Sequence, residues 1–276
     1  MTQSKPNKPA PLKVSTAEKG PFNLLRPIQI LAISLYFMFD TILHLLLTFQ
    51  ISTFLSISAF QSAWFARFWA FFGPLSAENA APAVMPLLQN HARGVCLDIG
   101  PGSGQWLYLF QRANNPDITK IYGVEPNVGL HPALRESARK AGLENVYEVI
   151  GCGAEELQTK GGLQPGSIDT IITVQCLCSI PTPQKIIKEL YPLLKSGGQW
   201  LVFEHIKTKY QGSFVGYWQK AINIVWPHML GGCNTTRPTD EWLLKTGDWK
   251  KVNLYPGAGE GPYDTMPHVI GTLTKK

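Results

Sequence analysis

The stretch "VCLDIGPGSGQW", residues 95–106, decides the fold of this chain. It is an apolar run that ends on Asp98 and then breaks into three glycines, Gly100, Gly102 and Gly104. A short buried strand followed by a glycine-rich turn is typical of the first unit of a doubly wound α/β sheet, where the turn holds a ligand. The dinucleotide fingerprint G-x-G-x-x-G is missing, because a frame that starts at Gly100 reaches Gln105 instead of a third glycine.

The acid beside the glycines indicates which ligand the loop prefers. A carboxylate at Asp98 repels a pyrophosphate and attracts a ligand that carries an ammonium and a sulfonium group. Glycines let the backbone approach such a ligand closely, and Glu125 at the end of the next apolar run is suited to accept hydrogen bonds from two ribose hydroxyls. S-adenosylmethionine has both positive groups and no phosphate. We therefore expect it as the cofactor, bound by Asp98, Gly100, Gly102, Gly104 and Glu125.

Strand-like and helix-like patterns alternate after Pro74. The expected strands cover residues 94–100, 120–127, 145–153, 168–180 and 198–206, and two more lie at 249–255 and 267–275. This order predicts a doubly wound α/β sheet whose ligands lie beyond the C-terminal ends of the strands.

Two further stretches at strand ends are candidates for cofactor contacts. Ala154 and Glu155 follow the third expected strand and can offer a backbone amide and a carboxylate to the adenine edge. The alternative is that these acids only begin a helix, where negative charge is favourable. Gln175 and Cys176 lie at the tip of the fourth strand, where we expect them beneath the cofactor and facing the acceptor.

The N-terminal quarter of the chain has the composition of a membrane element. Residues 1–26 hold a net charge of +4 out of the chain's +6, which fits attraction to anionic lipid or a solvated tail equally well. From residue 27 to 60 the only charged residue is Asp40, and residues 41–60 are long enough to cross a bilayer as a helix. We expect a basic tail at 1–26, a hydrophobic membrane-associated segment at 27–74 and a catalytic domain at 75–276.

The topology of that segment has two solutions. The positive-inside rule places the basic tail in the cytosol, so a single crossing would put the catalytic domain on the opposite side, away from a cytosolic cofactor. A hairpin or a helix lying in one leaflet removes the conflict, and we favour it. Tyr36, Asp40, His44 and Thr48 would then form a polar stripe, with Asp40 able to pair with His44, that lines an entry path or packs on another helix.

Charge and cysteine content exclude other classes of partner. The chain beyond residue 26 carries only +2 and has no obvious basic groove, so we expect no nucleic acid. The five cysteines are odd in number and lack a metal-ligand spacing, which predicts a reduced domain without a metal. Cys176 and Cys178 should share one face of the fourth strand.

Several segments resemble a known family. They are "QCLCSI" (175–180) with the following "PTPQKIIKELYPLLKSGGQWLVFEHI", then "YWQKAINIVWPHMLGGCNTTR" (217–237) and "PHVIG" (267–271). Over about residues 90–276 the chain resembles class I S-adenosylmethionine-dependent methyltransferases, and within them the membrane-anchored methyltransferase-like seven family of thiol S-methyltransferases. The resemblance implies a mostly parallel, seven-stranded Rossmann-like sheet, a thiol acceptor, and a cytosol-facing enzyme on the endoplasmic reticulum or a lipid droplet.

The chain also departs from that family. Pro101 stands where the family usually has cysteine, and "TTRPTDEW" (235–242) is longer than its counterpart. Similar chains resemble fungal natural-product methyltransferases that act on carboxyl or hydroxyl groups, so an O-methyltransferase of secondary metabolism remains the alternative. Less favoured are a nicotinamide oxidoreductase, which the glycine spacing opposes, and a non-catalytic membrane scaffold.

Candidate residues for the acceptor side follow from their chemistry. His205, beside Glu204 at the end of the fifth strand, is suited to act as a base or to orient the acceptor, or else it is a hydrogen-bonded structural group. A mixed aromatic and polar segment further on suits a small lipophilic acceptor with one polar end, and an arginine suits a carboxylate. That segment supplies Trp218, Trp226, His228, Asn234 and Arg237, which otherwise pack in the core or brace the loop.

Overall fold

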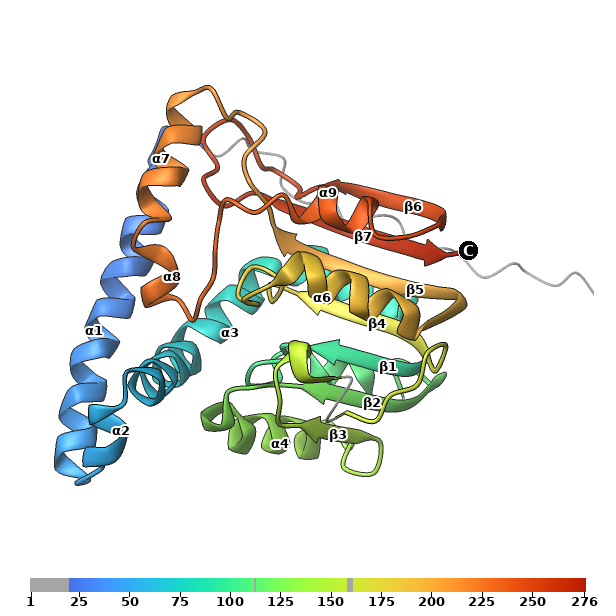
Figure 1. Cartoon of the computed structure of the whole chain (residues 1–276), viewed down its shortest axis with the longest axis horizontal. Helices are drawn as coiled ribbons and strands as arrows, with labels where there is room; N and C mark the ends of the chain where they lie inside the picture. Colours follow the sequence, from blue (N-terminus) through green and yellow to red (C-terminus); the bar gives the residue numbers. More distant parts are fainter. Residues whose placement is uncertain (1–19, 112, 158–160) are drawn as a thin grey trace, which may run out of the picture.

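A computed structural model of the chain describes residues 20–111, 113–157 and 161–276. It contains a seven-stranded sheet with the order β3-β2-β1-β4-β5-β7-β6 (Figure 1). The first five strands are parallel, and β7 runs antiparallel to both β5 and β6. The predicted doubly wound sheet is confirmed. Its strands are β1 (Gly94–Ile99), β2 (Ile118–Val124), β3 (Tyr147–Ile150), β4 (Ile168–Val174), β5 (Leu194–His205), β6 (Trp249–Pro256) and β7 (His268–Lys275).

Helices cover both faces of the sheet, which is why its central strands are apolar on both sides. One face packs against the C-terminal part of α3 (Ile57–His91) and α4 (His131–Lys140). The other face packs against α6 (Pro183–Leu190) and α9 (Thr239–Leu244). Short 3-10 turns connect these elements: η1 (Pro21–Leu25), η2 (Leu107–Phe110), η3 (Val128–Leu130), η4 (Ala154–Glu156) and η5 (Tyr191–Leu193).

The N-terminal helices form a layer beyond one end of the sheet. Helix α1 (Arg26–Leu47) is followed by the short α2 (Ile51–Leu55) and by α3, and α1 lies beside α7 (Phe214–Ile222) and α8 (Trp226–Met229) (Figure 1). A third apolar cluster joins these helices, with Phe68 fully buried among Ile30, Trp64, Ile222, Trp226 and Leu230. Residues 27–74 thus share a core with the C-terminal half of the chain.

The expected boundary between residues 74 and 75 falls inside one helix. α3 continues through Pro74 and runs to His91, where its last turns pack on the sheet. Its first turns carry Trp64 and Phe68 into the third cluster. The helix therefore connects the expected membrane segment rigidly to the expected catalytic domain, and a cut at this boundary would divide a packed element.

The segment from Pro21 to Leu47 is long and apolar enough to cross a membrane, by length and composition. One side of α1 is buried in the protein, whereas Leu35, Phe39, Leu43 and Leu47 on its other side are exposed. The polar stripe is not paired as expected, because Asp40 binds Arg67 of α3 at 2.7 Å and leaves His44 exposed.

Strand β4 is shorter than predicted. It ends at Val174 because Gln175 adopts a φ of +55°, a left-handed conformation that turns the chain out of the sheet. Cys176 and Cys178 therefore do not lie side by side on a strand. The thiol of Cys176 meets Glu204, and that of Cys178 meets Cys233.

Candidate active site

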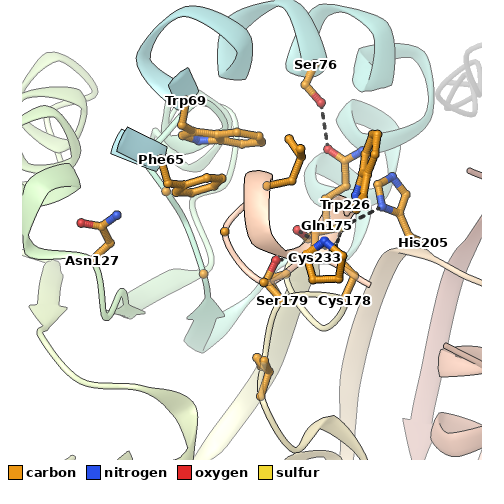
Figure 2. A pocket seen from close by; sticks show the side chains of 18 of the residues that line it. Phe65, Trp69, Ser76, Asn127, Gln175, Cys178, Ser179, His205, Trp226 and Cys233 are labelled. Carbon is orange, nitrogen blue, oxygen red and sulfur yellow. Dashed lines mark hydrogen bonds between the residues drawn. The ribbon is translucent and has the colours of Figure 1, made fainter. Parts of the chain in front are cut away.

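A cavity of about 750 Å³ lies beyond the C-terminal ends of β1, β2, β4 and β5. The glycine loop and the residues after β2 line one side of it. The N-terminal layer lines the other side with aromatic rings from α3, among them Trp64, Phe65, Phe68 and Trp69. Figure 2 shows Phe65 and Trp69. A volume of this size, with an apolar wall and a few convergent polar groups, is typical of a small-molecule site.

The glycine loop is built for close approach. Gly100 and Gly102 have φ values of +67° and +61°, which side chains rarely adopt. A Cβ atom at Gly100 would lie 2.6 Å from Cβ of Cys176, and one at Gly102 would lie 2.6 Å from Nε1 of Trp69. Gly104 has the same backbone conformation, at φ +81°. The glycines thus let the loop backbone pack directly against Cys176 and Trp69, which a side chain at Gly100 or Gly102 would displace.

Glu125 lines the cavity directly after β2. Its carboxylate accepts hydrogen bonds from the backbone N–H groups of Gly102 at 3.0 Å and Asn127 at 2.8 Å. These bonds fix the side chain beside the glycine cradle, as the prediction of a ribose contact requires. Burial raises the pKa of Glu125 to about 7, and the two N–H donors act against that rise.

Asp98 lies behind the loop instead of in the large cavity. Its carboxylate is buried, accepts a long hydrogen bond of 3.4 Å from the Tyr147 hydroxyl, and borders a separate space of about 30 Å³ beneath Gly100 and Gly104. Burial raises the pKa of Asp98 to about 7. Asp98 thus borders this smaller space and does not line the large cavity.

The other predicted cofactor residues line the cavity. Ala154 and Glu155 do so in the 3-10 turn after β3, where Glu155 is exposed. Gln175 also lines it, and the Ser76 hydroxyl donates to its Oε1 at 3.1 Å. Cys176 lies against the cradle at Gly100. The structure therefore brings the predicted cofactor residues together around the glycine loop. Asp98 differs from the others because it lies behind the loop, outside the large cavity.

The predicted catalytic role of Glu204 is not supported by its position. Its side chain is fully buried away from the cavity, where its carboxylate accepts hydrogen bonds from the N–H groups of Cys176 at 3.1 Å and Leu177 at 3.1 Å and from the Cys176 thiol at 3.3 Å. Burial raises the pKa of Glu204 to about 7. Glu204 positions the turn after β4 and does not reach an acceptor.

His205 lines the cavity, as expected, and its neighbours there are two cysteines. Its Nδ1 lies 3.7 Å from Sγ of Cys233, and the sulfurs of Cys233 and Cys178 are 3.1 Å apart (Figure 2). Contact with Cys178 lowers the pKa of the Cys233 thiol, while the same contact and burial raise that of Cys178. Burial alone would lower the pKa of His205, but its neighbours Cys178 and Glu204 raise it.

The predicted substrate residues divide into two groups. Trp226 and His228 line the cavity. Trp218, Asn234 and Arg237 do not: the indole of Trp218 donates to the carbonyl of Leu24, and Asn234 accepts from the N–H and hydroxyl of Thr236. The guanidinium of Arg237 donates at 2.7 Å to the carbonyls of Leu177 and Ile180. Arg237 thus braces a loop, which was the alternative to its predicted role in binding a carboxylate.

Sequence reasoning missed a histidine–carboxylate pair in the cavity. His268 begins β7, and its Nδ1 lies 2.6 Å from Oε1 of Glu260, while its Nε2 lies 3.2 Å from the side-chain nitrogen of Gln175. Its ring stacks on Phe203 and contacts His205. The signal was available in the segment "PHVIG", but only the folded sheet places β7 next to β5.

The aromatic row of α3 also lines the cavity. The stretch "WFARFWAFFG", residues 64–73, has the composition of a segment at the level of lipid headgroups. In the structure Phe65 stacks on Trp69 with ring centroids 5.7 Å apart, and both rings face the cavity (Figure 2). These rings form one apolar wall of the cavity.

Comparison with known proteins agrees with this geometry. A family model described as a methyltransferase domain matches residues 75–240. The thiol S-methyltransferase TMT1B of Rattus norvegicus is 29% identical over 184 residues, covering 65% of this chain and 70% of that one. TMT1A of Homo sapiens is 23% identical over 222 residues, covering 77% and 86%. The apo structure of the S-adenosylmethionine-dependent methyltransferase SibL shares the fold, with a TM-score of 0.53 at 18% identity over 77% of this chain and 58% of that one.

Proposed function

This chain belongs to the methyltransferase domain family, and from that premise we propose that it methylates the sulfur of a small lipophilic thiol at a membrane surface. The methyl donor is S-adenosylmethionine. The thiol acceptor rests on the similarity to proteins named thiol S-methyltransferases.

One observation carries the proposal: a single cavity combines a glycine cradle with an aromatic wall. The loop at Gly100 and Gly102 presents its backbone to the cavity, and Glu125 beside it offers a fixed carboxylate to ribose hydroxyls. The wall of Trp64, Phe65 and Trp69 lines the same cavity, and Trp69 lies directly beside Gly102. An apolar acceptor on this wall would be held close to a donor in the cradle.

The chain's own residues contribute mainly by orientation. The bound donor supplies an electrophilic methyl group on a sulfonium, so holding the acceptor in line within a dry cavity accounts for most of the rate. The aromatic wall excludes water and binds the apolar part of the acceptor. The proton of the acceptor goes to Nε2 of His268, which Glu260 orients through Nδ1, once the Gln175 amide that lies 3.2 Å from Nε2 has moved aside.

A second candidate function is O-methylation of a hydroxyl group. The pair of His268 and Glu260 favours it, because an alcohol or phenol needs a base whereas a thiol near its pKa of about 8.5 needs little help. A carboxyl acceptor is less well supported, since Arg237 is bound to backbone carbonyls outside the cavity.

Membrane association is the second part of the proposal. The exposed apolar face of α1 supports membrane contact. It carries Leu35, Phe39, Leu43 and Leu47, and a soluble protein would rarely expose these side chains together. Because the opposite face of α1 is packed on the protein, we favour a helix lying in one leaflet over a crossing. The catalytic cavity then faces the cytosol, at the endoplasmic reticulum or a lipid droplet.

The test uses full-length protein in detergent with labelled S-adenosylmethionine and three classes of acceptor: alkyl thiols, phenols or alcohols, and lipophilic carboxylic acids. Label on thiols alone supports the proposal. Label on hydroxyl acceptors alone replaces it with O-methylation. Calorimetry with S-adenosylmethionine and with a nicotinamide cofactor is the control for the cradle, and binding of only the latter would refute both functions.

A further inference from the structure

Cys178, Cys233 and His205 converge on one wall of the cavity. They come from the turn after β4, the loop after α8 and the end of β5, and their Sγ, Sγ and Nδ1 atoms all lie within 4.8 Å of one another (Figure 2). All three residues line the cavity. The sulfurs of Cys178 and Cys233 are in contact, and these two cysteines form no disulfide. We propose that these three side chains form a zinc site whose fourth position opens into the cavity.

The distances fit a tetrahedral ion. Zinc–sulfur bonds of about 2.3 Å and zinc–nitrogen bonds of about 2.0 Å place two sulfurs about 3.8 Å apart and a sulfur and nitrogen about 3.6 Å apart. The separation of Cys233 Sγ and His205 Nδ1 is 3.7 Å. The two sulfurs, at 3.1 Å, need to move apart by a fraction of an ångström, which a rotation of either side chain supplies.

The backbone around the site holds the ligands in place. The N–H of Asn234 donates at 2.8 Å to the carbonyl of Cys178, which ties the two cysteine loops together. Arg237 clamps the same loop through the carbonyls of Leu177 and Ile180. On the other side, Glu204 binds the N–H of Leu177 and precedes His205 on β5. A polar frame that fixes ligand directions is what a metal site requires.

Three protein ligands and an open position are typical of a catalytic zinc site and not of a structural one, which is closed by four. Two thiolates and a neutral imidazole leave the ion with no net charge, so it retains affinity for one more anionic ligand. The open position faces the cavity that holds the aromatic wall. A thiol is the acceptor whose sulfur zinc binds best.

This part rests on the proposed thiol acceptor and extends it. The acceptor thiol binds zinc as a thiolate, displaces a water molecule and passes its proton to His268 or to solvent. Its sulfur then forms a bond to the methyl carbon while the carbon–sulfur bond of the sulfonium breaks, and that electron pair stays on the donor's sulfur. The products are two neutral thioethers, which bind zinc more weakly than a thiolate, so water returns to the ion.

The experiment measures zinc in the full-length protein. Detergent-solubilised protein is dialysed against buffered zinc and then against metal-free buffer, and its zinc content is determined by mass spectrometry. We expect about one ion per chain, lost in Cys178→Ser and in Cys233→Ser and retained in Cys96→Ser, a buried cysteine in β1 outside the cavity. Equal zinc in all four proteins, or none in the unsubstituted chain, would overturn the site.

Two further readouts keep the result independent of folding and of the acceptor. Cobalt added to the unsubstituted protein should give thiolate-to-metal charge-transfer absorption, and zinc should protect Cys178 and Cys233 from alkylation; unprotected thiols would speak against the site. Thiol methylation is then compared with and without zinc. Zinc binding without any thiol methylation defeats the proposed acceptor alone, whereas equal thiol methylation by zinc-free protein defeats only the catalytic role of the metal.

Discussion

His268 Nδ1 lies 2.6 Å from Glu260 Oε1, and the same ring contacts His205 with centroids 4.4 Å apart. The Glu260 carboxylate thus orients the His268 ring, which lines the cavity. The side chain of Gln175 contacts the other ring nitrogen, Nε2. The arrangement has the geometry of a base held in one tautomer by its partner.

We predict that Glu260→Gln lowers kcat/KM for a thiol acceptor at pH 6.5 by about tenfold or more, and by much less at pH 9. At the higher pH the thiol is ionised before it binds, so the pair His268–Glu260 has no proton to accept. A pH profile of kcat/KM checks this, with Glu241→Gln in α9, outside the cavity and paired with Lys207, as the control. A loss that is equal at both pH values would indicate a structural role for Glu260.

Glu125 should be required for the cofactor. Replacing Glu125 by Ala removes the acceptor of the Gly102 and Asn127 N–H groups as well as the contact with ribose, and hydrogen bonds to a charged group contribute about 1.5–3 kcal/mol each. We expect the Kd for S-adenosylmethionine to rise roughly 10- to 100-fold in calorimetry. An unchanged Kd would mean that the cradle does not hold the ribose.

The ligand-free protein should lose stability as pH rises. Burial raises the pKa values of Asp98, Glu125 and Glu204 to about 7 in the folded state, from 3.8, 4.5 and 4.5. A raised folded pKa contributes stability that is present below the unfolded pKa and is lost as pH rises through about 7. Thermal unfolding midpoints should therefore fall between pH 5 and pH 8. In Glu204→Gln the fall should shrink by roughly a third; the same slope as in the unsubstituted chain would contradict the assignment.

The first helices should be part of the folded enzyme. Phe68 is fully buried between α1 and α8, so Phe68→Ala leaves a cavity in the third apolar cluster and costs about 3–5 kcal/mol. Phe71, on the same helix, is half exposed, and Phe71→Ala is the matched control. The two thermal midpoints should differ clearly. Equal midpoints would show that α3 is a detachable anchor, as the expected boundary at residue 74 implies.

Membrane binding should depend on the outer face of α1. Leu43 and Leu47 are 57% and 70% exposed, and lysines at both positions would have to leave the acyl region. We expect Leu43→Lys with Leu47→Lys to reduce sedimentation with vesicles strongly while calorimetric binding of S-adenosylmethionine is kept. Val252→Lys is the control, because it replaces an exposed apolar side chain by lysine in the edge strand β6, away from α1. If Val252→Lys reduces sedimentation with vesicles to the same extent, the added positive charge and not the loss of the apolar face of α1 would explain the result.

The sequence alone determined the sheet and the cofactor side of the cavity. Each of the seven predicted strands has a counterpart in the sheet, although β4 ends six residues earlier than predicted, because alternation and short apolar runs report local backbone geometry. The positions of Gly100, Gly102 and Glu125 were predictable for the same reason: parallel strands gather their C-terminal ends at one edge, so residues that follow those strands meet there.

The acceptor side was decided only by the tertiary structure. Cys178 and Cys233 are 55 residues apart in the sequence and meet because the left-handed turn at Gln175 and the bond from Asn234 to Cys178 set the directions of two loops. Arg237 carries a charge that suits a substrate, yet two backbone carbonyls hold it elsewhere. Spacing in a sequence predicts which elements form, but side-chain directions in loops depend on long-range packing and hydrogen bonds that no local pattern encodes.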